Sequence, residues 1–408
     1  MDRTQNPYAP GAGYQPPELA GRDVLLRDAQ IDLQRIRDGK PTKSLMLLGL
    51  RGVGKTVLLN RLHTIAVDLR FQAIKIEAPE GGQLARLMVP EIRRILHGLD
   101  LLLATKAALK RSFGILRNFV KAFKISVGDV DFGIELTPGE GDTGDIEQDV
   151  PVLLLSVARV AKEANTAVAL FIDEVQYLSP SELSAIIVAC HQAAQMGLPL
   201  FFVGAGLPQI AALAGNAKSY AERLFDYPEI GPLDPEAARR ALVAPARRAG
   251  VEYGEDAADS ILAITERYPY FIQEWGFHVW NYAEVTPISA ADVEATQAAI
   301  IRHLDANFFR VRFDRLTALQ QKYLRAMAEL GKGPFKTGDI AAILEVEATT
   351  VAPVRKQLID KGMVWTQRHG ETAFTVPLFD AFMRRQMPVF ERHIPKRRSR
   401  SPSLEPHS

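Results

Sequence analysis

The segment Gly49-Leu-Arg-Gly-Val-Gly-Lys-Thr56 has the residue types and the spacing of a phosphate-binding loop. Its glycines permit backbone angles that point successive N–H groups inward, and these groups form an anion nest at the positive end of the following helix. Lys55 would neutralise the outer phosphates, and Thr56 would offer its hydroxyl to Mg²⁺. We therefore expect ATP and Mg²⁺ to be held by this loop, through Gly49, Arg51, Gly52, Val53, Gly54, Lys55 and Thr56.

Two adjacent acids, Asp173 and Glu174, end the apolar run Val168-Ala-Leu-Phe-Ile172. A buried strand beside the phosphate loop would bring Asp173 to the metal ion, while Glu174 could polarise a water for in-line attack. The pattern predicts a catalytic role for Glu174 and a magnesium ligand in Asp173. The alternative is that both acids only cap the next helix, because carboxylates favour helix N-termini.

Short apolar runs alternate with helical patterns in the first half of the chain. Such alternation predicts a parallel sheet covered by helices, and near-continuous apolarity predicts strands buried on both faces. The expected strands are residues 44–49, 71–76, 168–172 and 198–203. This part of the chain is therefore predicted to be α/β, with the parallel sheet of a P-loop NTPase. Helical periodicity without strands over residues 234–304 predicts a helical lid, and the pattern after it, described below, predicts a C-terminal winged helix-turn-helix.

Composition limits the classes of partner. Lys and Arg number 49 against 48 Asp and Glu, so the whole chain has no field that would attract nucleic acid or an acidic membrane. The one cysteine, Cys190, excludes an intramolecular disulfide framework and fits a cytoplasmic protein. Residues 183–217 lack charge, but His, Gln, Gly and Pro interrupt them, which favours a buried helix and strand over a membrane span.

The order of five motifs resembles that of AAA+ ATPases, most of all the origin-recognition branch and its signalling STAND relatives. The motifs are Gly21-Arg-Asp23, the phosphate loop, Asp173-Glu174, Gly204-Ala-Gly206 and Tyr220-Ala-Glu-Arg-Leu-Phe225. The resemblance implies that Arg22 lies by the adenine side and that Arg223 is an arginine finger reaching the γ-phosphate of a neighbouring subunit. It therefore also implies a nucleotide-dependent homo-oligomer. The alternative for Arg223 is a surface ion pair with Glu222 or Asp226.

Two departures from the family pattern bear on the rate of hydrolysis. Where the first sensor usually offers a polar side chain, this chain reads Phe202-Val-Gly-Ala-Gly-Leu207. In the second sensor region, Arg267 takes the glycine place of the STAND Gly-x-Pro motif. Exposure to solvent is its expected state, and contact with phosphate is the alternative. The first departure predicts slow hydrolysis.

An insertion over residues 84–150 carries a basic amphipathic helix between Thr105 and Lys124, followed by a hairpin-like pattern over 125–136 and an acidic loop. Origin-recognition ATPases insert a DNA-contacting element in a similar place, so the resemblance implies contact with phosphates. The alternative is a helix packed on the sheet and neutralised by its own acidic loop.

The C-terminal unit, residues 315–388, has the outline of a winged helix-turn-helix. Thr317 and Gln320 form a capping box, Thr337 opens a second helix, and Thr349-Thr350 open a third with Pro353 in its first turn. If this unit binds DNA, its third helix would enter the major groove with Arg355 and Lys356, and Arg368 on the wing would contact phosphates. Winged helices of this superfamily also dock proteins.

We expect five segments: a flexible N-terminus (1–17), the ATPase core (18–233), the lid (234–304), the winged helix (315–388) and a basic Ser/Pro tail (392–408). Two functions remain open. The first is an ATPase that hydrolyses ATP to ADP and assembles on duplex DNA. The second is a nucleotide-gated switch, slow at hydrolysis, that acts on a protein partner.

Overall fold

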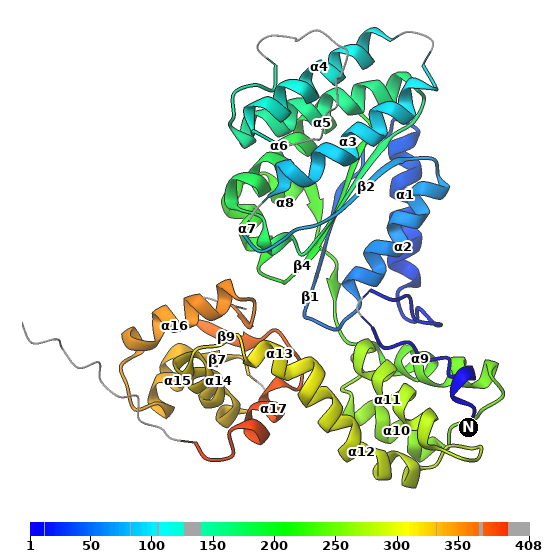
Figure 1. The fold of residues 1–408 in the computed structure, drawn as a ribbon, viewed down its shortest axis with the longest axis vertical. Helices are drawn as coiled ribbons and strands as arrows, with labels where there is room; N and C mark the ends of the chain where they lie inside the picture. Colours follow the sequence, from blue (N-terminus) through cyan, green and yellow to red (C-terminus); the bar gives the residue numbers. More distant parts are fainter. Residues whose placement is uncertain are drawn as a thin grey trace, which may run out of the picture. The chain divides into compact units, whose positions relative to one another are not determined.

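The computed structural model describes residues 1–390 except residues 12, 82, 104–105, 126–139, 332 and 367–369. The chain divides into two compact units, residues 1–300 and 301–408, which are described separately below. Figure 1 shows a sheet with helices on both faces in the first unit, and a smaller set of helices with a short sheet in the second. No described helix is long and apolar enough to cross a membrane.

The first unit is built on a parallel sheet with the strand order β2-β3-β4-β1-β5, in which β6 also pairs with β1. The four predicted strands are present with small shifts of their ends, and the α/β prediction is confirmed. Sequence patterns did not predict β5 and β6, because each has only two residues. The strands are β1 (Ser44–Gly49), β2 (Gln72–Glu77), β3 (Val168–Asp173), β4 (Leu200–Gly206), β5 (Phe225–Asp226) and β6 (Glu229–Ile230).

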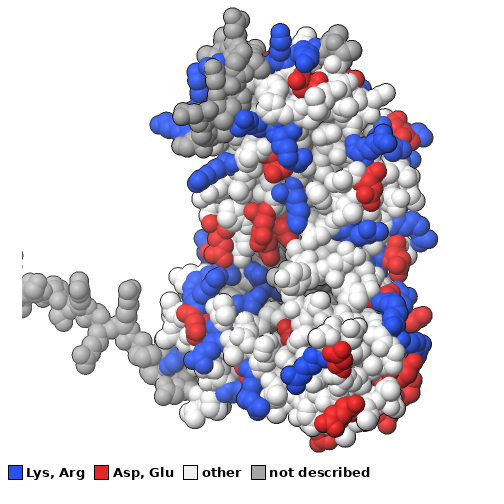
Figure 2. Space-filling model, turned by 45° about the vertical axis from the view of Figure 1, so that its right-hand side comes forward, with Lys and Arg blue, Asp and Glu red and all other residues white. Residues whose placement is uncertain are grey.

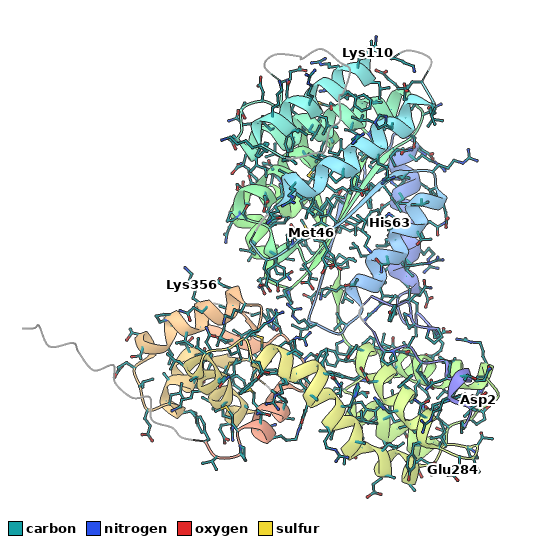
Figure 3. All side chains as sticks on the ribbon, in the orientation of Figure 1. Asp2, Met46, His63, Lys110, Glu284 and Lys356 are labelled. Carbon is teal, nitrogen blue, oxygen red and sulfur yellow. The ribbon has the colours of Figure 1, made fainter. Side chains whose placement is uncertain are left out.

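Helices cover both faces of this sheet (Figure 1). Successive residues of β1 point to opposite faces, so that Leu47 packs with α1 (Asp23–Arg37) and α2 (Lys55–Asp68), while Met46 joins the core on the other side. In Figure 3, Met46 lies in the sheet and His63 on α2. The second face is covered by α3 (Leu84–Asp100), α5 (Ile146–Glu163) and α6 (Pro180–Gln195). Two short helices, α7 (Ile210–Ala217) and α8 (Ala221–Leu224), follow β4.

The predicted basic helix is α4 (Ala107–Ala122), which lies over α3 and α5. Its apolar side is buried, with Phe113, Leu116 and Phe119 in the core. Arg111 forms a bidentate pair with Glu140, and the Lys106 ammonium lies 2.8 Å from an Asp100 carboxylate oxygen. These contacts favour the packed and partly neutralised alternative for α4. The predicted hairpin over 125–136 lies almost entirely outside the described residues.

Three helices after the sheet, here called the lid helices, are α9 (Pro235–Arg248), α10 (Glu255–Ile264) and α11 (Pro269–Tyr282). Their core contains the largest buried side chains of the first unit, Trp275 and Trp280. Asp234 caps α9 by accepting the N–H of Ala237, and Pro235 follows in the first helical position. A further helix, α12 (Ala290–Leu304), begins in the first unit and ends in the second.

The expectation of a flexible N-terminal segment is wrong for its described residues. The Tyr8 side chain is buried against the lid helices, and its hydroxyl donates to the Leu242 carbonyl. The Asn6 amide bonds to the Phe277 carbonyl, and the Asn60 amide of α2 donates to the Gly13 carbonyl at 3.2 Å. An aromatic ring and paired backbone groups hold the segment on the lid helices, which composition alone could not indicate.

The second unit begins with a π-helical turn (Asp305–Phe309) and α13 (Arg310–Phe313). A three-stranded antiparallel sheet, order β7-β9-β8, then packs with four helices. Its elements are α14 (Ala318–Leu330), β7 (Phe335–Lys336), α15 (Thr337–Ile343), α16 (Ala348–Asp360), β8 (Val364–Trp365), β9 (Glu371–Phe374) and α17 (Phe379–Gln386). The capping box of Thr317 and Gln320 is present at the start of α14.

One boundary in the second unit differs from the prediction. Helix α16 begins at Ala348 after an extended Glu347, one residue before Thr349. Pro353 therefore sits in the second turn rather than the first, where it interrupts one backbone hydrogen bond of the helix. Helix α17 was not predicted; its Phe382 stacks on Phe309, and its Phe379 meets Phe309 edge to face, which closes the core.

Removal of the Tyr8 ring tests the docking of the N-terminal segment. Tyr8→Ala should lower the free energy of unfolding of the first unit by ~3 kcal/mol, because a large buried ring leaves a cavity. The measurement is urea denaturation followed by tryptophan fluorescence. Tyr14→Ala is the matched control: Tyr14 is 67% exposed, so its loss should change stability by less than ~0.5 kcal/mol. Equal stability of Tyr8→Ala and wild type would contradict the docking.

Candidate nucleotide-binding site

The phosphate loop joins the end of β1 to the first turn of α2. Gly52 and Gly54 have φ angles of 82° and 92°, a region that glycine enters freely. Gly54 is the N-cap of α2, and no side chain caps this helix. The first N–H groups of α2 thus lack a side-chain acceptor, which is the arrangement that binds anions at a helix N-terminus.

Gly49 has a different role from the one expected. Its φ is not positive, and it lies within β1. A Cβ added at this position would lie 2.3 Å from the backbone oxygen of Ile230, so a side chain would push β6 away from β1. Gly49 therefore allows the close approach of the neighbouring strand rather than an unusual backbone angle.

Lys55 is only 8% exposed, and its ammonium donates to the Leu50 carbonyl at 2.9 Å. Burial lowers the pKa of Lys55 to about 8, an effect that the carboxylates of Glu174 and Asp173 partly oppose. Among the described residues this carbonyl is the one hydrogen-bond acceptor of the buried ammonium, and phosphate oxygens would stabilise the group further.

Asp173 ends β3 and reaches the same place from the other side. Its Oδ2 accepts the hydroxyl of Thr56 at 2.7 Å, and burial raises the pKa of its carboxyl group. The sheet register explains the meeting, because Met46 of β1, Gly204 of β4 and Ile172 of β3 form one row. A hydroxyl and a carboxylate side by side are hard oxygen donors, and this donor set fits Mg²⁺.

Glu174 follows with a left-handed backbone (φ 52°) and starts a 3-10 turn, Val175–Tyr177. Its Oε1 lies 3.8 Å from Nη1 of Arg51, and its Oε2 accepts the side-chain amide of Gln176. The alternative in which the two acids cap the next helix is wrong. Helix α6 is capped by Ser179, which forms a capping box with Glu182.

The lid helices touch the phosphate loop directly. The N–H of Tyr270, in the first turn of α11, donates to the Gly52 carbonyl at 3.2 Å. Arg267, just before α11, is exposed as predicted and has a φ of 59°, which explains why the related motif carries glycine there. Arg22 is half-buried and donates to the Gly231 carbonyl; burial lowers the pKa of its guanidinium.

Arg223 lies on α8 with an exposed side chain. Among the described residues no ion pair involves Arg223, and Asp226 instead pairs with Lys43 at 2.9 Å. The surface ion pair offered as the alternative for Arg223 is therefore not formed with Asp226.

The predicted DNA-contacting residues differ from one another. The guanidinium of Arg355 donates to the hydroxyls of Thr372 and Thr366 and to the Glu371 carbonyl at 2.7 to 2.9 Å. Arg355 therefore points into its own unit and is unsuited to read a groove. Lys356 is exposed and points away from α16 (Figure 3). Arg368 lies outside the described residues.

Sequence reasoning missed three side chains or groups that the structure brings to the site. Gln176 and Tyr177 follow Glu174 in the chain, and Tyr177 accepts a hydrogen bond from Arg51 at 2.9 Å. Tyr270 comes from the lid helices. No motif identified them, although a glutamine two residues after Glu174 was visible in the sequence.

A parallel sheet with β4 between β1 and β3, a glycine loop before a helix, and an acid at the end of β3 define a P-loop NTPase. Residues 18–203 match the AAA ATPase domain family. Residues 18–203 are therefore an AAA+ P-loop ATPase domain, and the prediction of ATP hydrolysis by a P-loop ATPase is confirmed. Residues 306–383 match a family described as a domain of unknown function (DUF8462). No curated protein matches the sequence.

Solved structures resemble most of the chain at low sequence identity. The Walker-type ATPase PABY2304 of Pyrococcus abyssi is 16% identical, with a TM-score of 0.53, over 90% of this chain and 96% of that one. The Thermotoga maritima RuvB Holliday junction branch migration motor is 16% identical (TM-score 0.43, 89% and 96%). The Aeropyrum pernix Orc1 protein in complex with DNA is 17% identical (TM-score 0.46, 92% and 94%). The first of these likenesses supports the fold.

Replacement of Lys55 tests the phosphate loop. Lys55→Ala should weaken ATP binding by at least ~100-fold, because the buried ammonium that faces the phosphates is lost. Isothermal titration calorimetry measures the change, and Lys40→Ala, which removes an exposed lysine of the same unit, is the control. An unchanged affinity in Lys55→Ala would refute the assignment of the loop.

Proposed function

We propose that the protein binds ATP with Mg²⁺ and hydrolyses it to ADP, and that this cycle is coupled to assembly on duplex DNA. The contact between Thr56 and Asp173 across the phosphate loop carries the first part of the proposal. These two residues would hold Mg²⁺, which would offset charge on the phosphates. The single buried cysteine, Cys190, agrees with action in the cytoplasm.

The residues of the site divide the chemical work. The loop amides and Lys55 hold the triphosphate, and Glu174 holds a water by accepting its proton as the water oxygen attacks the γ-phosphorus. The bond between the γ-phosphorus and the bridging oxygen breaks, and that oxygen leaves with ADP. Arg22 is proposed to lie by the adenine of the nucleotide.

Arg223 is proposed to complete this site in a neighbouring copy. Its exposed position on α8 and its lack of an ion pair among the described residues agree with such a role. An arginine supplied in trans stabilises the charge of the transition state and makes the rate depend on assembly.

The second unit is proposed to be a winged helix-turn-helix that contacts DNA. Helices α14, α15 and α16 followed by the β8–β9 strand pair have the element order of that motif. Charge supports the proposal: residues 301–408 carry 19 Lys and Arg against 11 Asp and Glu, whereas residues 1–300 carry 30 against 37. The basic balance of one part is the electrostatic feature that phosphates recognise. Lys356 is the described candidate, with Arg368 of the predicted wing.

Helix α4 offers a second basic surface. Lys and Arg side chains gather at the end of the first unit where α4 lies (Figure 2). Lys110 on α4 is exposed, and Figure 3 shows it at that end. Because Arg111 and Lys106 already pair with acids, only the remaining lysines of α4 would add to DNA binding.

A nucleotide-gated switch acting on a protein partner is the second candidate. The inward direction of Arg355 favours it, since α16 is left with few polar groups that could read bases. The β4 end, Gly204-Ala-Gly206, also lacks a polar side chain near the site, which agrees with slow hydrolysis.

The role of Glu174 is tested by an isosteric change. Glu174→Gln should keep ATP affinity but lower kcat by about 100- to 10,000-fold, because an amide cannot accept the water's proton. Phosphate release reports kcat, and calorimetry reports affinity. Glu163→Gln is the control, because Glu163 is an exposed glutamate at the end of α5, before β3 begins, whereas the site lies where β3 ends. Phosphate release by Glu174→Gln at the wild-type rate would remove Glu174 from the mechanism.

Assembly on DNA is tested by the ATPase rate with and without duplex DNA across protein concentrations. The rate per protomer should rise with protein concentration and with DNA. Arg223→Ala should lose this rise, and its rate in the assembled state should fall by about a thousandfold or more. Binding of labelled duplex should weaken steeply between about 50 and 200 mM salt, and less steeply for Lys356→Ala. A rate independent of concentration in the wild type would remove the basis for Arg223. Absent or salt-independent DNA binding would favour the switch.

A further inference from the structure

The side chain of Gln176 connects two strand ends at the site. It belongs to the 3-10 turn that follows β3, and it reaches the residues that follow β4. Its Oε1 accepts the N–H of Leu207 at 3.1 Å, and its Nε2 donates to Oε2 of Glu174. One amide thus joins the backbone beyond β4 to the acid proposed as the general base.

The hydrogen-bond partners determine the direction of this amide. Leu207 offers a backbone N–H, which needs an acceptor, and the Glu174 carboxylate needs a donor. Rotation of the amide by 180° would place two donors together at Leu207 and two acceptors together at Glu174. The Gln176 side chain is therefore held in one orientation by both neighbours.

The glycine at the end of β4 makes room for Gln176. A Cβ added at Gly206 would lie 2.3 Å from the Gln176 amide oxygen and 2.2 Å from Cδ1 of Ile210. Any side chain at position 206 would displace the amide from the Leu207 N–H. The Gln176 side chain can therefore reach Leu207 only because residue 206 is glycine.

Glu174 is held from a second side by the phosphate loop. Nη1 of Arg51 lies 3.8 Å from its Oε1, while Nη2 of Arg51 donates to the Tyr177 hydroxyl at 2.9 Å. The backbone of Glu174 is in the left-handed region, which costs energy for a residue with a side chain. The turn that carries Gln176 keeps the acid in this conformation, so the direction of the carboxylate depends on its neighbours.

We propose that Gln176 is a positioning residue, which aims the Glu174 carboxylate at the attacking water from the end of β4. An amide suits this task because it donates a hydrogen bond without taking the proton that Glu174 must accept. The inference rests on the proposed role of Glu174. In this proposal Gln176 orients the Glu174 carboxylate, and the backbone N–H of Leu207 holds the Gln176 side chain in place.

Three variants separate positioning from packing. Gln176→Met keeps the length of the side chain but has no amide, and Gln176→Glu keeps an acceptor for the Leu207 N–H but replaces the donor by oxygen. Both should lower kcat by about 10- to 100-fold with ATP affinity unchanged, because a carboxylate that is no longer aimed at the water accepts its proton less efficiently. Gln195→Met, on the exposed end of α6, is the control and should retain wild-type kcat.

A purely structural Gln176 gives a different result. Gln176→Glu would then keep wild-type kcat because the Leu207 contact remains, and that outcome overturns the proposal. Loss of ATP affinity in parallel with kcat would overturn it as well. Should Gln176→Met fail to fold, as shown by its melting temperature, Gln176→Glu alone decides the question.

A double substitution connects Gln176 to Glu174. In single-turnover measurements, Gln176→Glu should lower the residual rate of Glu174→Ala by less than about twofold, since its target is already gone. A full additional loss would overturn the proposal. Wild-type turnover in Glu174→Gln would instead defeat the proposed base itself, so the two failures are distinguishable.

Discussion

The site depends on placing an ammonium and a carboxylate in one buried space without joining them directly. Lys55 comes from the helix after β1 and Asp173 from the end of β3, with β4 between the two strands. Burial disfavours both charges, lowering one pKa and raising the other. The parallel sheet holds the two groups at one edge, and the loop amides supply partial positive charge. A polyanion with a divalent cation would satisfy every member of this set.

Local sequence patterns were enough to predict the strands, the loop and the acids, because their chemistry and their position are encoded in neighbouring residues. The two-residue strands β5 and β6 carry no period that a pattern could reveal. Gln176 and Tyr270 reach the site only through the sheet register and the packing of the lid helices. The docked N-terminal segment was missed for the same reason, since one buried ring, Tyr8, outweighs a composition rich in proline and glycine.

In the second unit, a residue of the type that binds nucleic acid points into the protein instead of toward solvent. Arg355 follows Val354, which is buried, and precedes Lys356, which is exposed, so it lies on the flank of α16. There its planar group finds three oxygen acceptors on the neighbouring strands and the segment between them. A basic residue counted from sequence as a contact for nucleic acid here stabilises the fold, and Lys356 remains on the outer face.

The hydrogen bond from Tyr270 to Gly52 has a mechanical consequence. Gly52 lies in the phosphate loop, and Tyr270 lies in the first turn of α11, whose last turn carries the buried Trp280. A rotation of α11 would either break this hydrogen bond or move the backbone of the phosphate loop with the helix. The orientation of α11 and the backbone conformation of the phosphate loop are therefore linked through this hydrogen bond.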